Sequence, residues 1–128
     1  MLYLTSCLFG TVVLHAHYQA NHVIHFLFLL LTMLSVLFHS MHCFDAKRVV
    51  PVLFKNIHVL DRTLARFLVV YVSYKFYFII GCYALLGSLS IILLWIALLS
   101  EKDELRGVRL HALLHIIAVL YSHSLLLC

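Results

Sequence analysis

Long apolar stretches alternate with short polar segments along this chain, and the lengths of the apolar stretches predict helices that cross a membrane. A hydrocarbon layer about 30 Å thick requires about 20 residues of α-helix. The pattern predicts a bundle of five transmembrane helices, or of four if the first does not span. Their expected bounds are about residues 2–17, 22–43, 61–77, 80–99 and 110–127. Residues 1–128 would thus form a single transmembrane helical domain, all-α in class.

The polar segments set the expected boundaries. Residues 44–60 contain the only proline, Pro51, and we expect a loop or interfacial turn there because VVPVLF is too short to span. Residues 60–99 form one apolar block that would reach about 60 Å as a single helix, so the chain must fold back. We expect the break near Gly81, because glycine tolerates a turn and the nearby Lys75 requires an interface.

Composition supports a membrane protein. Hydrophobic residues make up 65% of the chain and charged residues 11%, whereas soluble domains have about 45–50% apolar and about 25% charged residues. The net charge is +4 with histidine neutral. Because the basic residues form no solvated stripe, this charge indicates topology and contact with anionic lipid, and we expect no nucleic acid partner.

The basic residues also predict an orientation. Only Lys75 belongs to the side that holds the turn near Gly81. Eight lie on or near the opposite side, which holds the segments 44–60 and 100–109: Lys47, Arg48, Lys55, Arg62, Arg66, Lys102, Arg106 and Arg109. By the positive-inside rule that second side is cytoplasmic or matrix-facing, with the N-terminus in and the C-terminus out. The sequence leaves the organelle open between the mitochondrial inner membrane and the endomembranes.

Five polar residues stand out within the apolar helices: Ser35, His39, Asp61, His111 and His115. Polar groups at membrane depth are costly and tend to be functional. The predicted topology places Ser35 and His39 in the last turns of the second helix, Asp61 at the start of the third, and both remaining histidines in the first turns of the fifth. All five would then lie at one depth. Residues four apart share a helix face, so each pair can point into the bundle.

Three histidines and a carboxylate that converge are typical of a metal site. Neutral imidazole is a good zinc ligand, and zinc lowers the pKa of a bound water to about 7. Asp61 could hold or deprotonate such a water. Ser35, one turn before His39, could hydrogen-bond a ligand or stabilise an oxyanion.

The stretch SVLFHSMHC, followed by LDRT and then by HALLH near the end, resembles the CREST superfamily. That superfamily includes alkaline ceramidases, the progestin and adipoQ receptors, haemolysin III-like proteins and the myomaker-related branch. Its motifs are Ser-x3-His on helix two, Asp at the start of helix three and His-x3-His on helix seven of a seven-helix bundle. The resemblance implies a metal-dependent lipid hydrolase that acts on amide or ester bonds. It further implies that His39, His111 and His115 bind zinc, with the catalytic residues Asp61 and Ser35 around the water.

This chain departs from the CREST pattern in having five expected helices instead of seven. The two missing helices fall between Asp61 and His111. Because two is an even number, the loss of two helices leaves the last helix starting from the same side of the membrane as in the superfamily. Partner chains or a second copy could supply the missing part of the bundle.

Two alternatives remain open at this stage. The first is a haem- or quinone-binding membrane anchor, with axial ligands from His39 and His111 or His115, or from His25 and His123. The second is a non-catalytic accessory subunit of a larger membrane complex, for example a mitochondrial respiratory or ATP synthase assembly. Small residues at Gly87 and Ser88 would allow close helix contact in such a complex. Membrane lipids and either other membrane subunits or a homo-oligomer are the expected partners.

The remaining histidines and the cysteines predict no further site. A structural role is expected for the histidines outside the motifs: His15, His17, His22, His25, His42, His58 and His123. The cysteines are widely spaced without a CxxC pair, so we expect free thiols: Cys7, Cys43, Cys82 and Cys128.

Overall fold

The computed structural model describes residues 2–127, and their side chains except those of residues 3, 46, 78–80 and 83. Cys128 lies outside the described residues. Within that range the chain is helical and forms no strand, which confirms the all-α class. The helices are α1 (Leu2–Cys7), α2 (Phe9–Tyr18), α3 (His22–Cys43), α4 (Ala46–Val49), α5 (Pro51–Ile80), α6 (Cys82–Ser100) and α7 (Glu104–Leu126).

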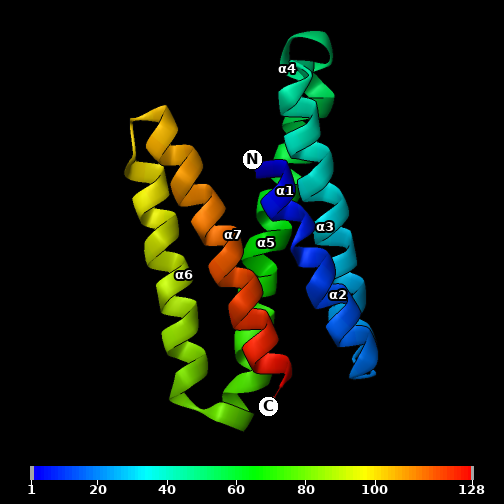
Figure 1. The fold of residues 1–128 in the computed structure, drawn as a ribbon, viewed down its shortest axis with the longest axis vertical. Coiled ribbons are helices and arrows are strands. Elements are labelled where there is room, and N and C mark those ends of the chain that lie inside the picture. The colour runs from blue at the N-terminus through cyan, green and yellow to red at the C-terminus, as the bar shows by residue number, and fades with distance from the viewer. Residues whose placement is uncertain (1, 128) are drawn as a thin grey trace.

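The long helices run side by side in alternating directions (Figure 1). Helices α1 and α2 follow one another as one rod, and α3, α5, α6 and α7 form four more. The α3–α5 connection, which carries α4, and the α6–α7 connection lie at one end of the molecule, whereas the α2–α3 and α5–α6 connections lie at the other. By length and composition, α3 and α7 are capable of crossing a membrane, and α6 contains a shorter apolar segment, Ala84–Ser100.

Local chemistry explains where several helices begin. Asn21 caps α3 by accepting a hydrogen bond from the Ile24 backbone amide, and Asp103 caps α7 in the same way with Arg106. The break expected near Gly81 is confirmed, because Gly81 separates α5 from α6. Its φ of 56° and ψ of −128° lie in a region that strongly favours glycine.

Two expected boundaries, the starts of α5 and α7, were wrong. Residues 44–60 were expected as a loop or turn, but α5 begins at Pro51, because proline lacks an amide hydrogen and its fixed φ suits the first helical position. Asp61 therefore lies three turns inside α5 and does not open a helix. Likewise α7 begins at Glu104 instead of residue 110, because the Asp103 cap starts it earlier, so the histidines of α7 lie beyond its first turn.

The first rod was expected as one helix over residues 2–17, but it is divided at Leu8. The Leu8 amide bonds the Thr5 carbonyl, and the Thr11 amide bonds the Leu8 carbonyl. Hydrogen bonds between residues three apart are typical of a short 3₁₀ turn, so the chain continues in the same direction from α1 to α2.

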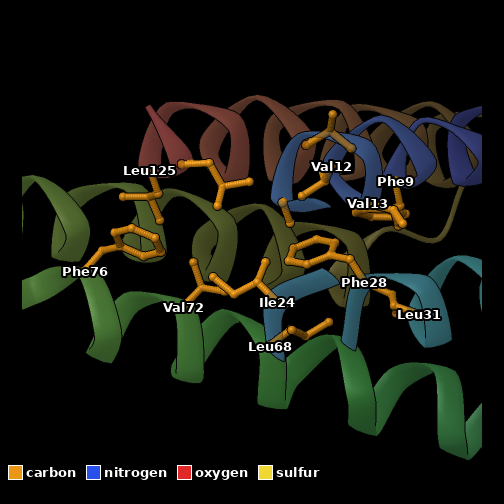
Figure 2. Packing of buried hydrophobic residues seen from close by; sticks show 13 residues of the cluster. Phe9, Val12, Val13, Ile24, Phe28, Leu31, Leu68, Val72, Phe76 and Leu125 are labelled. Carbon is orange, nitrogen blue, oxygen red and sulfur yellow. The ribbon is translucent and has the colours of Figure 1, made fainter. Parts of the chain in front are cut away.

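The hydrophobic core lies between α2, α3, α5 and α7. Figure 2 shows Phe9 and Val12 from the first rod, Phe28 from α3, Val72 from α5 and Leu125 from α7 packed around it. None of the described side chains of α6 belongs to this cluster. The core therefore fixes α3, α5 and α7, which carry the five residues selected from the sequence, while α6 packs outside it against α5 and α7.

A small polar cluster joins α6 to its neighbours. The Tyr121 hydroxyl on α7 donates to the Ala84 carbonyl oxygen of α6 at 2.5 Å and lies 3.3 Å from the Ser88 Oγ. The Ser88 hydroxyl also pairs with Ser73 of α5. The Tyr121 ring covers Gly87, where a Cβ atom would meet it at 2.1 Å. The small residues Gly87 and Ser88 thus allow close contact within this chain.

Candidate metal centre

Three imidazoles from two helices converge at one point in the structure. His39 projects from α3, and His111 and His115 project from successive turns of α7. The ring centroids lie 5.1 Å apart for His39 and His111, 5.6 Å for His39 and His115, and 4.7 Å for the two α7 histidines. One ligand-capable nitrogen from each residue lies within 4.8 Å of the others. The four-residue spacing on α7 places both its histidines on the face toward α3.

The chemistry of this cluster fits a metal ion. His39 and His115 are buried, and His39 Nε2 has no hydrogen-bond partner among the described residues. A buried polar atom without a partner is costly, and a metal would satisfy it. Nitrogens at about 2.0–2.1 Å from one zinc in tetrahedral geometry lie about 3.4 Å apart, and the three nitrogens here lie within 4.8 Å of one another. Imidazole nitrogen donors suit zinc and also copper, iron and nickel.

Asp61 and Ser35 lie in the wall of the same cavity as the histidines. Asp61 is only 8% exposed, and its Oδ1 has no hydrogen-bond partner in the described structure. The Ser35 side chain interacts with the Asp61 carboxyl group. The structure therefore brings together all five residues that the sequence singled out, although Asp61 reaches this place from inside α5.

The cavity has a volume of about 630 Å³, within the range of about 300–1,000 Å³ typical of ligand sites. Its polar part holds the histidine cluster together with charged side chains such as Lys47 and Arg62. Its apolar part is lined by α5 and α6, including Leu68, Val72 and Trp95. Such a shape accommodates a ligand with a polar group at the histidines and an apolar chain along the helices.

Two hydroxyl residues of α1 that the sequence analysis did not select also reach the site. Thr5 Oγ1 lies 3.0 Å from His115 Nδ1, and Ser6 Oγ lies 3.0 Å from Ser35 Oγ. Both hydroxyl residues are buried. The only signal in the sequence was a pair of adjacent polar residues in the apolar run LYLTSCLF.

The other histidines lie outside the cluster. His58 stacks on Phe38, with ring centroids 4.6 Å apart. Of the alternative axial pair, His25 has its Nδ1 3.0 Å from the Val13 carbonyl oxygen, and the Nδ1 of His123 lies 2.8 Å from that of His15.

Comparison of the chain with models of known protein families, with curated proteins and with solved structures finds no match. Function is therefore argued from the site itself.

Proposed function

We propose that this chain is a multi-pass membrane protein that binds zinc at His39, His111 and His115 and hydrolyses an amide or ester bond of a lipid. The proposal rests on the convergence of the three imidazoles in the wall of an amphipathic cavity, which Asp61 with its unpaired Oδ1 also lines. The order of the Ser-x3-His, Asp and His-x3-His motifs, which resembles the CREST superfamily, supports it independently.

Each residue has a distinct role in the proposed site. When bound, zinc would act as a Lewis acid on the scissile carbonyl and on water. Asp61 is placed to accept a proton from the attacking water at its unpaired Oδ1. Ser35, whose side chain interacts with that carboxylate, would help to orient it. The buried surroundings of Ser35 and His39 exclude bulk water.

The cavity supports a lipid substrate. Its apolar part offers Leu68, Val72 and Trp95 to an acyl chain, and its polar part holds the histidine cluster where a carbonyl group would lie. Burying an alkyl chain against such side chains contributes about 0.8 kcal/mol per CH₂ group. Arg66 is held over the Trp95 ring at 4.8 Å, which keeps the indole in the cavity wall.

The proposal includes five membrane crossings, with the N-terminus in and the C-terminus out. Many large apolar side chains of α6 are exposed, among them Leu86, Leu93 and Leu99, and lipid would cover them. At about 1.5 Å per residue, α5 is about 45 Å long and exceeds the hydrocarbon layer of about 30 Å. Residues 51–60 would therefore extend from the membrane on the basic side.

A small ion explains the site better than haem does. Two axial imidazoles bind haem from opposite faces of a flat macrocycle, which must fit between them. Here three rings gather around one point in edge-to-face contact, with centroids 4.7–5.6 Å apart, which favours a small ion over two axial ligands on opposite faces of a macrocycle.

Metal analysis of the purified full chain in detergent tests the proposal. We expect about one zinc per chain in the wild type, hydrolysis of a fluorescent N-acyl amide or acyl ester, and loss of both in His39→Ala. His22→Ala is the matched control, since His22 is exposed at the other end of α3 and should change neither. A chain that carries no zinc and hydrolyses neither probe would contradict the proposal. Recovery of that chain only within a larger membrane complex would favour the accessory subunit instead.

A further inference from the structure

The helix α1 makes a side-chain contact with the proposed metal centre at a buried position. Thr5 Oγ1 lies 3.0 Å from His115 Nδ1 and 2.9 Å from the Leu2 carbonyl oxygen. Thr5 is 9% exposed and His115 7% exposed, so water has little access to this contact.

Hydrogen-bond chemistry fixes the direction of both contacts. A carbonyl oxygen only accepts, so the single hydroxyl proton of Thr5 is donated to Leu2. The Thr5 oxygen can then serve His115 only as an acceptor, and His115 must donate from a protonated Nδ1. In a neutral imidazole this leaves the lone pair on Nε2, the nitrogen free for a metal.

We infer that Thr5 is a positioning residue that holds His115 in the tautomer and ring orientation needed to bind the metal. This inference rests on the proposed metal centre and adds to it a residue outside the three motifs. Metal-binding histidines generally donate their second ring N–H to an acceptor oxygen of a carboxylate, a backbone carbonyl or water, a role that the Thr5 oxygen fills here, and loss of the partner typically weakens metal affinity about 10–100-fold. The second contact of α1, between Ser6 and Ser35, holds the same helix on α3.

The chain contains a matched control for this contact. Thr11 Oγ1 donates to the Leu8 carbonyl oxygen and lies 2.8 Å from His123 Nε2, so it repeats the same chemistry between the first rod and α7. His123 is not part of the three-histidine cluster. Thr11→Val therefore removes an inter-helix contact of the same chemistry, at an exposed position, without touching the metal centre.

The experiment measures Co²⁺ and Zn²⁺ affinity of the full chain in detergent, with the visible absorption of Co²⁺ reporting ligand geometry. We expect Thr5→Val to weaken both affinities about 10–100-fold and to alter the Co²⁺ spectrum. Thr5→Ser, which retains the hydroxyl, should restore both, and Thr11→Val should change neither. Equal losses in Thr5→Val and Thr11→Val would show a merely structural role and overturn the inference.

A second measurement does not depend on metal or on the folding of a variant. Nitrogen NMR of the metal-free wild type should show His115 protonated at Nδ1, and a proton on Nε2 instead would overturn the inference. If the wild type binds metal and Thr5→Val binds it equally well, the inference fails and the proposed function stands. If the wild type binds no metal, the proposed function fails, and the tautomer still decides whether Thr5 orients the ring.

Discussion

Asp61 is the residue whose surroundings differ most from those of an ordinary carboxylate. It is buried within α5, its Oδ1 has no partner in the described structure, and the Ser35 side chain interacts with the carboxyl group. A carboxylate that served only to stabilise the fold would be expected to have both oxygens paired. An unpaired oxygen in the wall of the cavity that holds the three imidazoles is better explained by a role toward a bound water.

The substitution Asp61→Asn tests this role because it keeps the shape of the side chain and removes its basicity. We expect hydrolysis of the acyl probe to fall by about 10²–10⁴-fold, the usual contribution of a general base, while the zinc content stays near that of the wild type. Turnover and metal content measured on the same preparation separate the two effects. Loss of zinc in Asp61→Asn would contradict the assignment and make Asp61 a metal ligand.

The residues of this site differ in how far the sequence could predict them. The pairs Ser35 and His39, and His111 and His115, were predicted to share helix faces because their spacing matches the helical period. Thr5 was not selected, because its contact joins two helices more than 100 residues apart and no spacing rule reports such a contact. The roles of these residues in metal binding and catalysis stay predictions.

At the scale of the elements, α5 shows that periodicity and composition do not determine where a helix begins. The polar residues between Phe44 and Leu60 suggested a loop, yet α5 begins at Pro51 and continues through this segment. A proline in the interior of a helix breaks or kinks it, whereas a proline at the first helical position favours the start of a helix. The sequence alone does not show which position Pro51 occupies. Gly81 was easier to predict, since a long apolar block had to fold back near it.

The α6–α7 contact gives a prediction at the same scale. In Gly87→Ala the new methyl group would meet the Tyr121 ring, which the hydrogen bond to the Ala84 carbonyl oxygen holds in place. We expect the free energy of unfolding to fall by about 1–3 kcal/mol, as for other overpacked contacts. Reversible denaturation in mixed detergent micelles would measure it.

Gly10→Ala is the matched control, because Gly10 lies within α2 and a Cβ atom there would meet nothing within 4 Å. Its free energy of unfolding should rise by about 0.5–1 kcal/mol, since alanine is the better helix former. Equal stability of both variants and the wild type would contradict the close packing of α6 on Tyr121.

At the scale of the whole molecule, the arrangement of the rods and the distribution of charge together predict a topology. The connection that carries α4 and the turn at Gly81 lie at opposite ends of the molecule (Figure 1). Lys75 lies near the Gly81 end, where its Nζ donates to Asn21 Oδ1. The other basic residues of the sequence gather toward the opposite end, as the positive-inside rule requires of a cytoplasmic or matrix-facing side.

Two native cysteines allow this topology to be measured. Cys43 ends α3 on the basic side, Cys82 begins α6 beside Gly81, and both are exposed and free. In variants that retain one cysteine each, a membrane-impermeant maleimide added to sealed right-side-out vesicles should label Cys82. Cys43 should react only after permeabilisation, because the proposed crossings place it on the inner face.

Labelling of both thiols from the same face of sealed vesicles would contradict an odd number of crossings between them, and with it the five-helix arrangement. Reversed labelling would keep the five crossings and overturn the orientation, which would mean that the basic residues near α4 contact ligand or partner groups on the outer face.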